Sequence, residues 1–123
     1  FKPKIICVEY NSFLGNKPIT VKYTKFYKRY DLDPERGLCY GASLEAWKML
    51  LLKYNYDFLT VDSSGVNAFF INPNEISSEV YNISKIDFKH HVHFQQKYNK
   101  SGEKLTEEVI NQFKDHLIYL DNF

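Results

Sequence analysis

Short apolar runs alternate with Gly and Pro breaks along the first half of the chain, and this pattern predicts its secondary structure. Residues 4–10, KIICVEY, form a β-branched apolar run after Pro3, which predicts a strand covered on both faces, as in a parallel sheet. Residues 11–37 predict a long loop in which ITVKY is a short extended piece. Its turn-forming residues are Gly15, Pro18, Pro34 and Gly37.

The next stretch, YGASLEAWKMLLLKYNY, predicts a helix over Leu44–Tyr54. Ser43 can accept hydrogen bonds from the first turn, and Glu45 suits the positive end of the helix dipole. Asn55 then tolerates the left-handed conformation that ends many helices. Apolar side chains recur at helical spacing, at Leu44, Trp47, Leu51 and Tyr54.

Two further strands are predicted at Tyr56–Asp62 and Val66–Asn72, joined by the turn SSG and ended by Pro73. So short a turn requires an antiparallel pair, whereas a strand, helix, strand passage normally returns parallel. The order therefore predicts an α/β unit with one antiparallel strand pair.

The pattern is weaker beyond Pro73. Residues 74–85 suit a short helix, and residues 86–98 show some alternation. Near the end, Thr106 is placed to cap a helix whose first turn is acidic. We expect one apolar stripe on this helix, formed by Val109, Ile110, Phe113, Leu117 and Leu120.

Composition narrows the class of protein. The chain has 123 residues, 44% of them hydrophobic, which is enough for one core and predicts a single domain over residues 1–123. Sixteen basic residues nearly balance fifteen acidic ones, so we expect neither nucleic acid nor a membrane surface as a partner. No apolar run is long enough to span a bilayer.

The cysteine pattern bears on the compartment. Cys7 lies in an apolar strand and Cys39 precedes a helix start. Two free thiols in a reducing, cytoplasmic compartment are expected, and a disulfide between them is the alternative.

The polar end of the first strand is the first candidate for chemistry. The carboxyl ends of parallel strands open into the crevice where α/β sheets bind ligands. Glu9 would there be a general base and Asn11 a hydrogen-bonding anchor for a substrate. Alternatively, Glu9 is solvated or paired with a Lys and Asn11 holds a loop. Composition alone favours this second interpretation.

The sequence HHVH is the candidate for a metal site. On a strand, His91 and His93 share one face while His90 points away. A catalytic zinc needs three protein ligands, so a half-buried strand with titratable His residues is the better interpretation. The chain also lacks a P-loop, a glycine-rich dinucleotide turn, a nucleophile elbow and a paired-Cys metal site.

Three pieces of the chain, in order, resemble FkbM-like members of the S-adenosylmethionine-dependent methyltransferases. They are PKIICVEYNSFLG, YGASLEAWKMLLLKYNYDFLTV and SSGVNAFFINP, which cover residues 3–73 and leave 74–123 as an unmatched tail. That group typically shows a strand ending in Glu-Tyr-Asn, a Tyr/Phe-Gly-Ala-Ser-Leu helix start, matched here at Tyr40–Leu44, and a Gly-Val-Asn-Ala-Phe-Phe strand. Asn55 departs from the pattern, because it stands where relatives often have Gly.

The resemblance implies a partial Rossmann-like methyltransferase sheet with a strand, a helix, an antiparallel strand pair and a C-terminal helix. The chain would be the C-terminal, acceptor-side part of a longer methyltransferase that acts on a small or sugar-like (glycan) acceptor. Glu9 would be catalytic, with Tyr10, Asn11, Ser43 and Asn67 binding the substrate. The loop and carboxylate that hold S-adenosylmethionine in this fold are missing, so we expect the parent protein, and not this chain alone, to bind that cofactor.

Two other hypotheses stay open. One is a non-catalytic α/β binding or assembly module that lacks the cofactor half and uses its aromatic residues as a partner surface. The other, weaker, is a nucleic-acid binder using residues 22–30, KYTKFYKRY, against which the neutral overall charge and the acidic DLDPE sequence argue. If the chain is a fragment, residues 5–8 form an unpaired edge, and we expect a homodimer, aggregation or pairing with the missing half.

Overall fold

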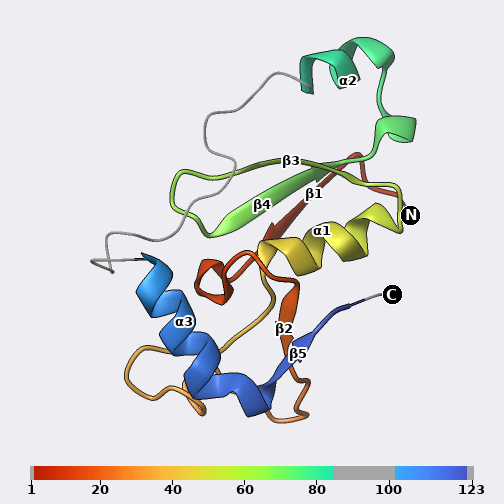
Figure 1. Ribbon diagram of the computed structural model, residues 1–123. Helices are drawn as coiled ribbons and strands as arrows, with labels where there is room; N and C mark the ends of the chain where they lie inside the picture. The colour runs from red at the N-terminus through yellow and green to blue at the C-terminus, as the bar shows by residue number, and fades with distance from the viewer. Residues whose placement is uncertain (1, 85–101, 122–123) are drawn as a thin grey trace.

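One strand from the start of the chain and two strands joined by a short turn form the larger sheet of the computed structural model, which describes residues 2–84 and 102–121 (Figure 1). They are β1 (Ile5–Glu9), β3 (Asp57–Val61) and β4 (Asn67–Ile71), in the spatial order β1-β4-β3. Because β4 pairs antiparallel with both neighbours, β1 and β3 run in the same direction without touching. The protein is thus a small mixed α/β fold with antiparallel sheets and a C-terminal helix.

The sheet corrects the expectation that the first strand is covered on both faces in a parallel sheet. Within the described residues all strand pairing is antiparallel. Ile6 and Val8 pack against a buried cluster, but Ile5 and Cys7 on the other face are exposed. The apolar run therefore reflects one buried face, and its remaining apolar side chains point to solvent in this structure.

Helix α1 (Leu44–Leu52) covers the buried face of this sheet. Ser43 caps it, since the Ser43 hydroxyl accepts the Ala46 N–H at 3.2 Å. The chain leaves the helix through Asn55, whose φ is 64°, so the predicted cap and stop are both confirmed. The first core consists of Tyr10, Leu44, Leu51, Tyr56, Val61, Ala68 and Phe70.

A second core lies below the first in Figure 1, between α3 (Gly102–Phe113), the short 3-10 helix η1 (Ser12–Leu14) and a two-stranded sheet. This sheet pairs β2 (Ile19–Val21) antiparallel with β5 (Leu117–Tyr119). The predicted extended piece is therefore a strand, and its partner comes from the far end of the chain. The buried residues are Phe13, Leu14, Ile19, Leu38, Cys39, Val109, Phe113 and Leu117.

The C-terminal helix exists, but its bounds differ from those predicted. Thr106 lies inside α3 and does not cap it. The helix ends at Phe113, and after the 3-10 turn η4 (Lys114–His116) the chain continues as β5. Leu117 is buried in the same core as the helix. The periodic pattern placed this apolar residue on a longer helix, but in the structure it reaches the core from strand β5.

The remaining elements follow β4. They are the 3-10 helix η2 (Pro73–Glu75) and helix α2 (Ser78–Ser84), so the short helix predicted there is confirmed. The Tyr81 hydroxyl donates to the Asp57 carboxylate at 2.9 Å, which ties α2 to β3. The HHVH sequence lies outside the described residues, and among those described no helix is long and apolar enough to cross a membrane.

Candidate functional site

The three sequence pieces that carry the resemblance meet at the carboxyl end of β1. Glu9 pairs with Asn67 of β4 across the strands, and the next residue, Tyr10, donates its N–H to the Val66 carbonyl at 2.9 Å. The Trp47 indole of α1 donates to the Glu9 carbonyl at 3.1 Å. Residues separated by up to 58 positions thus share one site.

Asn11 links this strand end to the loop before α1. Its side-chain amide donates to the carbonyls of Leu38 and Tyr40 at 2.7 and 2.9 Å, and its side-chain oxygen accepts the Phe13 N–H at 3.0 Å. The Asn11 backbone N–H donates to the Ala42 carbonyl at 2.8 Å. Because Asn11 is fully buried, this geometry matches the loop-holding interpretation, and a direct substrate contact would require these bonds to open.

Ser43 and Tyr10 are also enclosed by the protein. The Ser43 hydroxyl donates to the Lys17 carbonyl at 2.6 Å and accepts the Ile19 N–H at 3.0 Å, in addition to capping α1. Tyr10 belongs to the first hydrophobic core. Ser43 is fully buried and Tyr10 is only 3% exposed, so both residues support the predicted site from inside the fold and offer a ligand almost no surface.

Asn67 is held by the turn between β3 and β4. Its amide donates to the Asp62 carboxylate at 2.8 Å, and the Val66 N–H donates to the other carboxylate oxygen at 2.9 Å. Burial alone would raise the pKa of Asp62, but hydrogen bonds from Val66, Asn67 and Gly65 outweigh it and leave that pKa below its ordinary value. Asp62 is thus an ionised turn residue that fixes Asn67 opposite Glu9.

Glu9 is the predicted site residue that reaches solvent most openly, with 52% of its side chain exposed. Its carboxylate lies 3.9 Å from the guanidinium of Arg29, and that guanidinium lies 4.1 Å above the ring of Tyr40. Arg29 Nε also donates to the Gly37 carbonyl at 3.2 Å. An exposed pair of this kind contributes little to stability, so its interest is chemical: a carboxylate that can receive a proton stands beside a fixed cation.

Tyr40 completes this cluster as a neutral hydroxyl. Burial raises its pKa, the nearby Glu9 raises it further, and the charge and hydrogen bond of Arg29 only partly oppose them. The sequence named Tyr40 as part of the helix-start motif, but neither Tyr40 nor Arg29 was expected to belong to the site. The only signal for Arg29 was the basic and aromatic segment 22–30, whose loop conformation no local pattern could place against Glu9.

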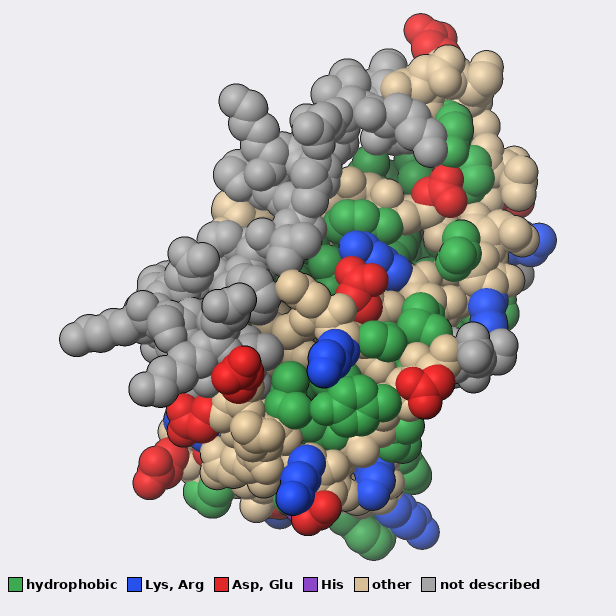
Figure 2. Space-filling view, in the orientation of Figure 1, with side chains coloured by type: hydrophobic (Ala, Val, Ile, Leu, Met, Phe, Trp, Pro, Cys, Tyr) green, Lys and Arg blue, Asp and Glu red, His purple; other side chains and the backbone are tan. Residues whose placement is uncertain are grey.

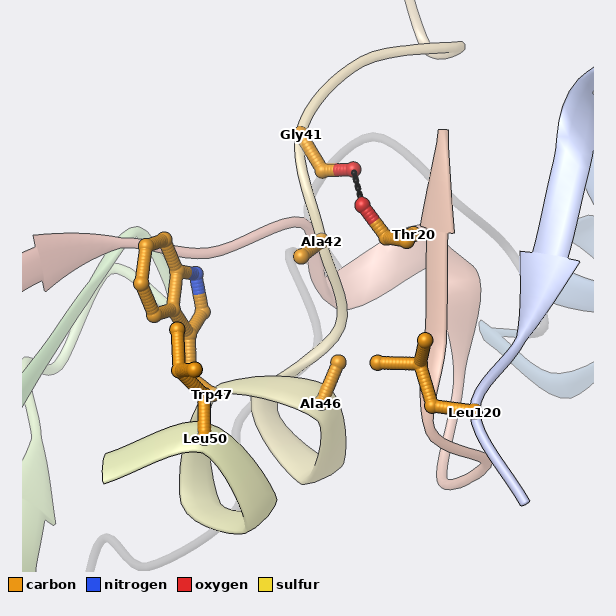
Figure 3. A pocket seen from close by; sticks show the side chains of 7 residues that line it. All are labelled: Thr20, Gly41, Ala42, Ala46, Trp47, Leu50 and Leu120. Carbon is orange, nitrogen blue, oxygen red and sulfur yellow. Dashed lines mark hydrogen bonds between the residues drawn. The ribbon is translucent and has the colours of Figure 1, made fainter. Parts of the chain in front are cut away.

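An apolar groove adjoins this cluster on the α1 side, and we call it the α1 groove. It has a volume of about 380 Å³. Figure 3 shows Trp47, Leu50 and Ala46 projecting from α1 toward it, with Leu120 on the opposite wall. Its lining residues are Thr20, Gly41, Ala42, Ala46, Trp47, Leu50 and Leu120.

The lining of the α1 groove does not match the charge of S-adenosylmethionine. Its sulfonium is a cation, yet the lining of the α1 groove contains no carboxylate. Nor do the residues that the structure places include three His, Cys, Asp or Glu side chains grouped to hold a metal. We therefore assign no chemical step of this chain to a bound cofactor.

Comparisons with known proteins do not assign this chain to a family. No family model matches the sequence, and neither the curated proteins nor the solved structures contain a significant match. The site must be interpreted from its own geometry.

Proposed function

We propose that this chain is the acceptor-side part of an S-adenosylmethionine-dependent methyltransferase with a Rossmann-like sheet, acting on the hydroxyl of a small or sugar-like acceptor. One observation carries the proposal: the three pieces that resemble the FkbM-like family converge at the end of β1, through the pairing of Glu9 with Asn67 and the bond from Asn11 to Ala42.

The order of the larger sheet also supports it. The passage from β1 through α1 to β3 leaves those strands running in the same direction, with β4 pairing antiparallel beside each. The resemblance implies a strand, its helix and a closing antiparallel pair, which is this succession. The elements that hold the methyl donor would then belong to the rest of the parent protein.

In this proposal Glu9 receives the proton of the acceptor hydroxyl, and Arg29, which lies over the ring of Tyr40, pairs with its carboxylate. Positioning contributes most to such a reaction, because the acceptor oxygen must approach the methyl group in line. Asn11, Ser43, Tyr10 and Asn67 support the site from behind through the hydrogen bonds and packing described above.

The test uses the complete gene product that contains this chain. Calorimetry should detect binding of S-adenosylmethionine, and methyl-labelled cofactor should transfer label to a small-molecule extract of the source cells. Glu9→Gln should lower transfer roughly 10²–10⁴-fold with cofactor affinity unchanged, whereas Glu35→Gln, an exposed carboxylate outside the site, should leave both unchanged. A complete product that binds no S-adenosylmethionine would remove the enzyme proposal and favour the non-catalytic module.

A further inference from the structure

The α1 groove continues into a second lobe of different chemistry. This lobe has a volume of about 330 Å³, and Thr20 and Gly41 line both lobes. The Thr20 hydroxyl donates to the Gly41 carbonyl at 3.3 Å, which marks the junction in Figure 3. A Cβ atom built on Gly41 would meet nothing within 4 Å, so the space beside this shared residue is open. The other lining residues are Val21, Lys22, Tyr23, Thr24 and Tyr27.

The first lobe offers an apolar environment. Ala46, Trp47 and Leu50 form one wall from α1, Leu120 forms the other, and the lining carries no ionisable side chain. Its volume lies within the range of small-molecule sites, about 300–1,000 Å³. Water gains few hydrogen bonds against such walls, so a hydrocarbon group that displaces it is favoured.

The second lobe offers one positive charge in a fixed frame. Among the residues that line the second lobe, Lys22 alone is charged at neutral pH. No carboxylate side chain lines either lobe. The Lys22 ammonium donates one hydrogen bond, to the Asp115 carbonyl at 2.7 Å, and an ammonium has two further donors for a ligand. The Tyr27 hydroxyl donates to the Cys39 carbonyl at 2.6 Å, which holds that wall in place.

The surface around the groove has the same mixed character. Tyr23 and Phe26 are 88% and 81% exposed, and Lys25 and Lys28 alternate with them along the same loop. Figure 2 shows hydrophobic side chains lying among Lys, Arg, Asp and Glu side chains on the lower part of the visible face. Lys22 in the second lobe therefore complements an anion, and the apolar lining of the first lobe complements a hydrocarbon.

We propose that the two lobes together bind an amphiphilic anion, with its hydrocarbon chain in the α1 groove and its phosphate or carboxylate at Lys22. This inference does not rest on the proposed methyl transfer, because it concerns binding alone. A nucleic acid strand is less suited to the groove, since it requires a series of cations along the backbone path and the lining supplies one.

Trp47 makes the proposal directly measurable, because it is the single Trp of the chain and lines the first lobe. Dodecyl phosphate is titrated below its critical micelle concentration while Trp47 fluorescence is recorded. We expect a saturable change of intensity and wavelength, and at least a tenfold weaker response to dodecyltrimethylammonium. A response that begins only at micelle formation, or equal binding of the cationic probe, would overturn the proposal.

Paired variants separate the two lobes. Lys22→Gln should weaken dodecyl phosphate binding about fivefold, the usual scale for an exposed ionic contact, and leave dodecanol binding unchanged. Lys4→Gln, at an exposed position before β1 and outside the lining of both lobes, is the control and should bind as the wild type does. Equal loss in both variants would show general charge attraction and contradict a site at Lys22.

Filling the first lobe should abolish binding. Ala46→Leu places a larger side chain in the groove, and thermal melting monitored by circular dichroism establishes whether this variant is folded. Leu50→Gln is the second variant: Leu50 is only partly buried, so the fold tolerates a polar group there, and we expect binding at least fivefold weaker. Undiminished binding in the folded variants would refute the assigned position of the hydrocarbon chain.

Discussion

Replacing Asn11 by Ala tests the side-chain hydrogen bonds that hold the end of β1 to the loop before α1. The change removes three side-chain hydrogen bonds, to the carbonyls of Leu38 and Tyr40 and from the N–H of Phe13. At about 1 kcal/mol for each bond, Asn11→Ala should lower the free energy of unfolding by about 3 kcal/mol. That is a large part of the roughly 5–15 kcal/mol typical of a domain.

The matched control is Asn72→Ala. Asn72 is buried and caps η2, as Asn11 caps η1, but its side chain accepts a single capping bond, from the Asn74 N–H at 3.0 Å. We expect a loss of about 1 kcal/mol for this variant. Urea unfolding followed by circular dichroism, with both variants and the wild type analysed at a common slope, measures the difference.

A third variant checks the donor role of the amide. Asn11→Asp keeps an acceptor for the Phe13 N–H but turns a carboxylate toward the carbonyls of Leu38 and Tyr40. Burial and these carbonyls should raise the pKa of the introduced carboxyl in the folded state, so the variant should regain stability as the pH falls. If Asn11→Ala lowers the free energy of unfolding no more than Asn72→Ala does, the hydrogen bonds of the Asn11 side chain do not hold the loop in place.

Three further changes test other features. Gly37→Ala should cost about 2 kcal/mol in urea unfolding, because Gly37 has a φ of 62° and an added Cβ would lie 2.6 Å from the ring of Tyr30; a cost below that of the exposed Lys2→Ala control would contradict the strain. Burial, reinforced by Asp33, raises the pKa of Cys39 to about 11, so at pH 8 a thiol reagent should label the exposed Cys7 alone and label both only after unfolding. With its thiol neutral in the fold, Cys39 should make stability fall as the pH rises from about 9 toward 11, where only the unfolded chain ionises. Ile5→Lys should weaken any self-association measured by sedimentation, because Ile5 is 56% exposed on β1, one edge of which pairs with no strand that the structure describes; a wild-type monomer at all concentrations would contradict an edge-mediated contact.

Local sequence signals placed the elements around α1 well, because their causes are local. Ser43 caps the helix through an atom three residues away, and Asn55 ends it through its own backbone conformation. The strand pair around the SSG turn follows from a loop too short for any other pairing. The prediction of two unbridged thiols is also confirmed, with Cys7 exposed and Cys39 buried.

The same signals misjudged elements whose partners lie far along the chain. An apolar run cannot reveal whether both faces of β1 are covered, and the structure leaves Ile5 exposed. Helical spacing assigned Leu117 to α3, yet that residue belongs to a strand because β2, almost a hundred positions earlier, offers an edge to pair with. Period alone does not distinguish a helix from a strand when a few apolar residues meet the same core.

The candidate site divides in the same way. By itself the sequence determined which polar residues follow β1, and that Glu9 and Asn11 would lie at its end. The tertiary structure decided their different positions. The Asn11 side chain is buried and makes three hydrogen bonds within the protein, while Glu9 stays exposed beside Arg29 and Tyr40. The physical reason is that a side chain's access to solvent depends on what the folded chain packs against it. That packing, and the α1 groove with it, arises from contacts between segments that no local pattern connects.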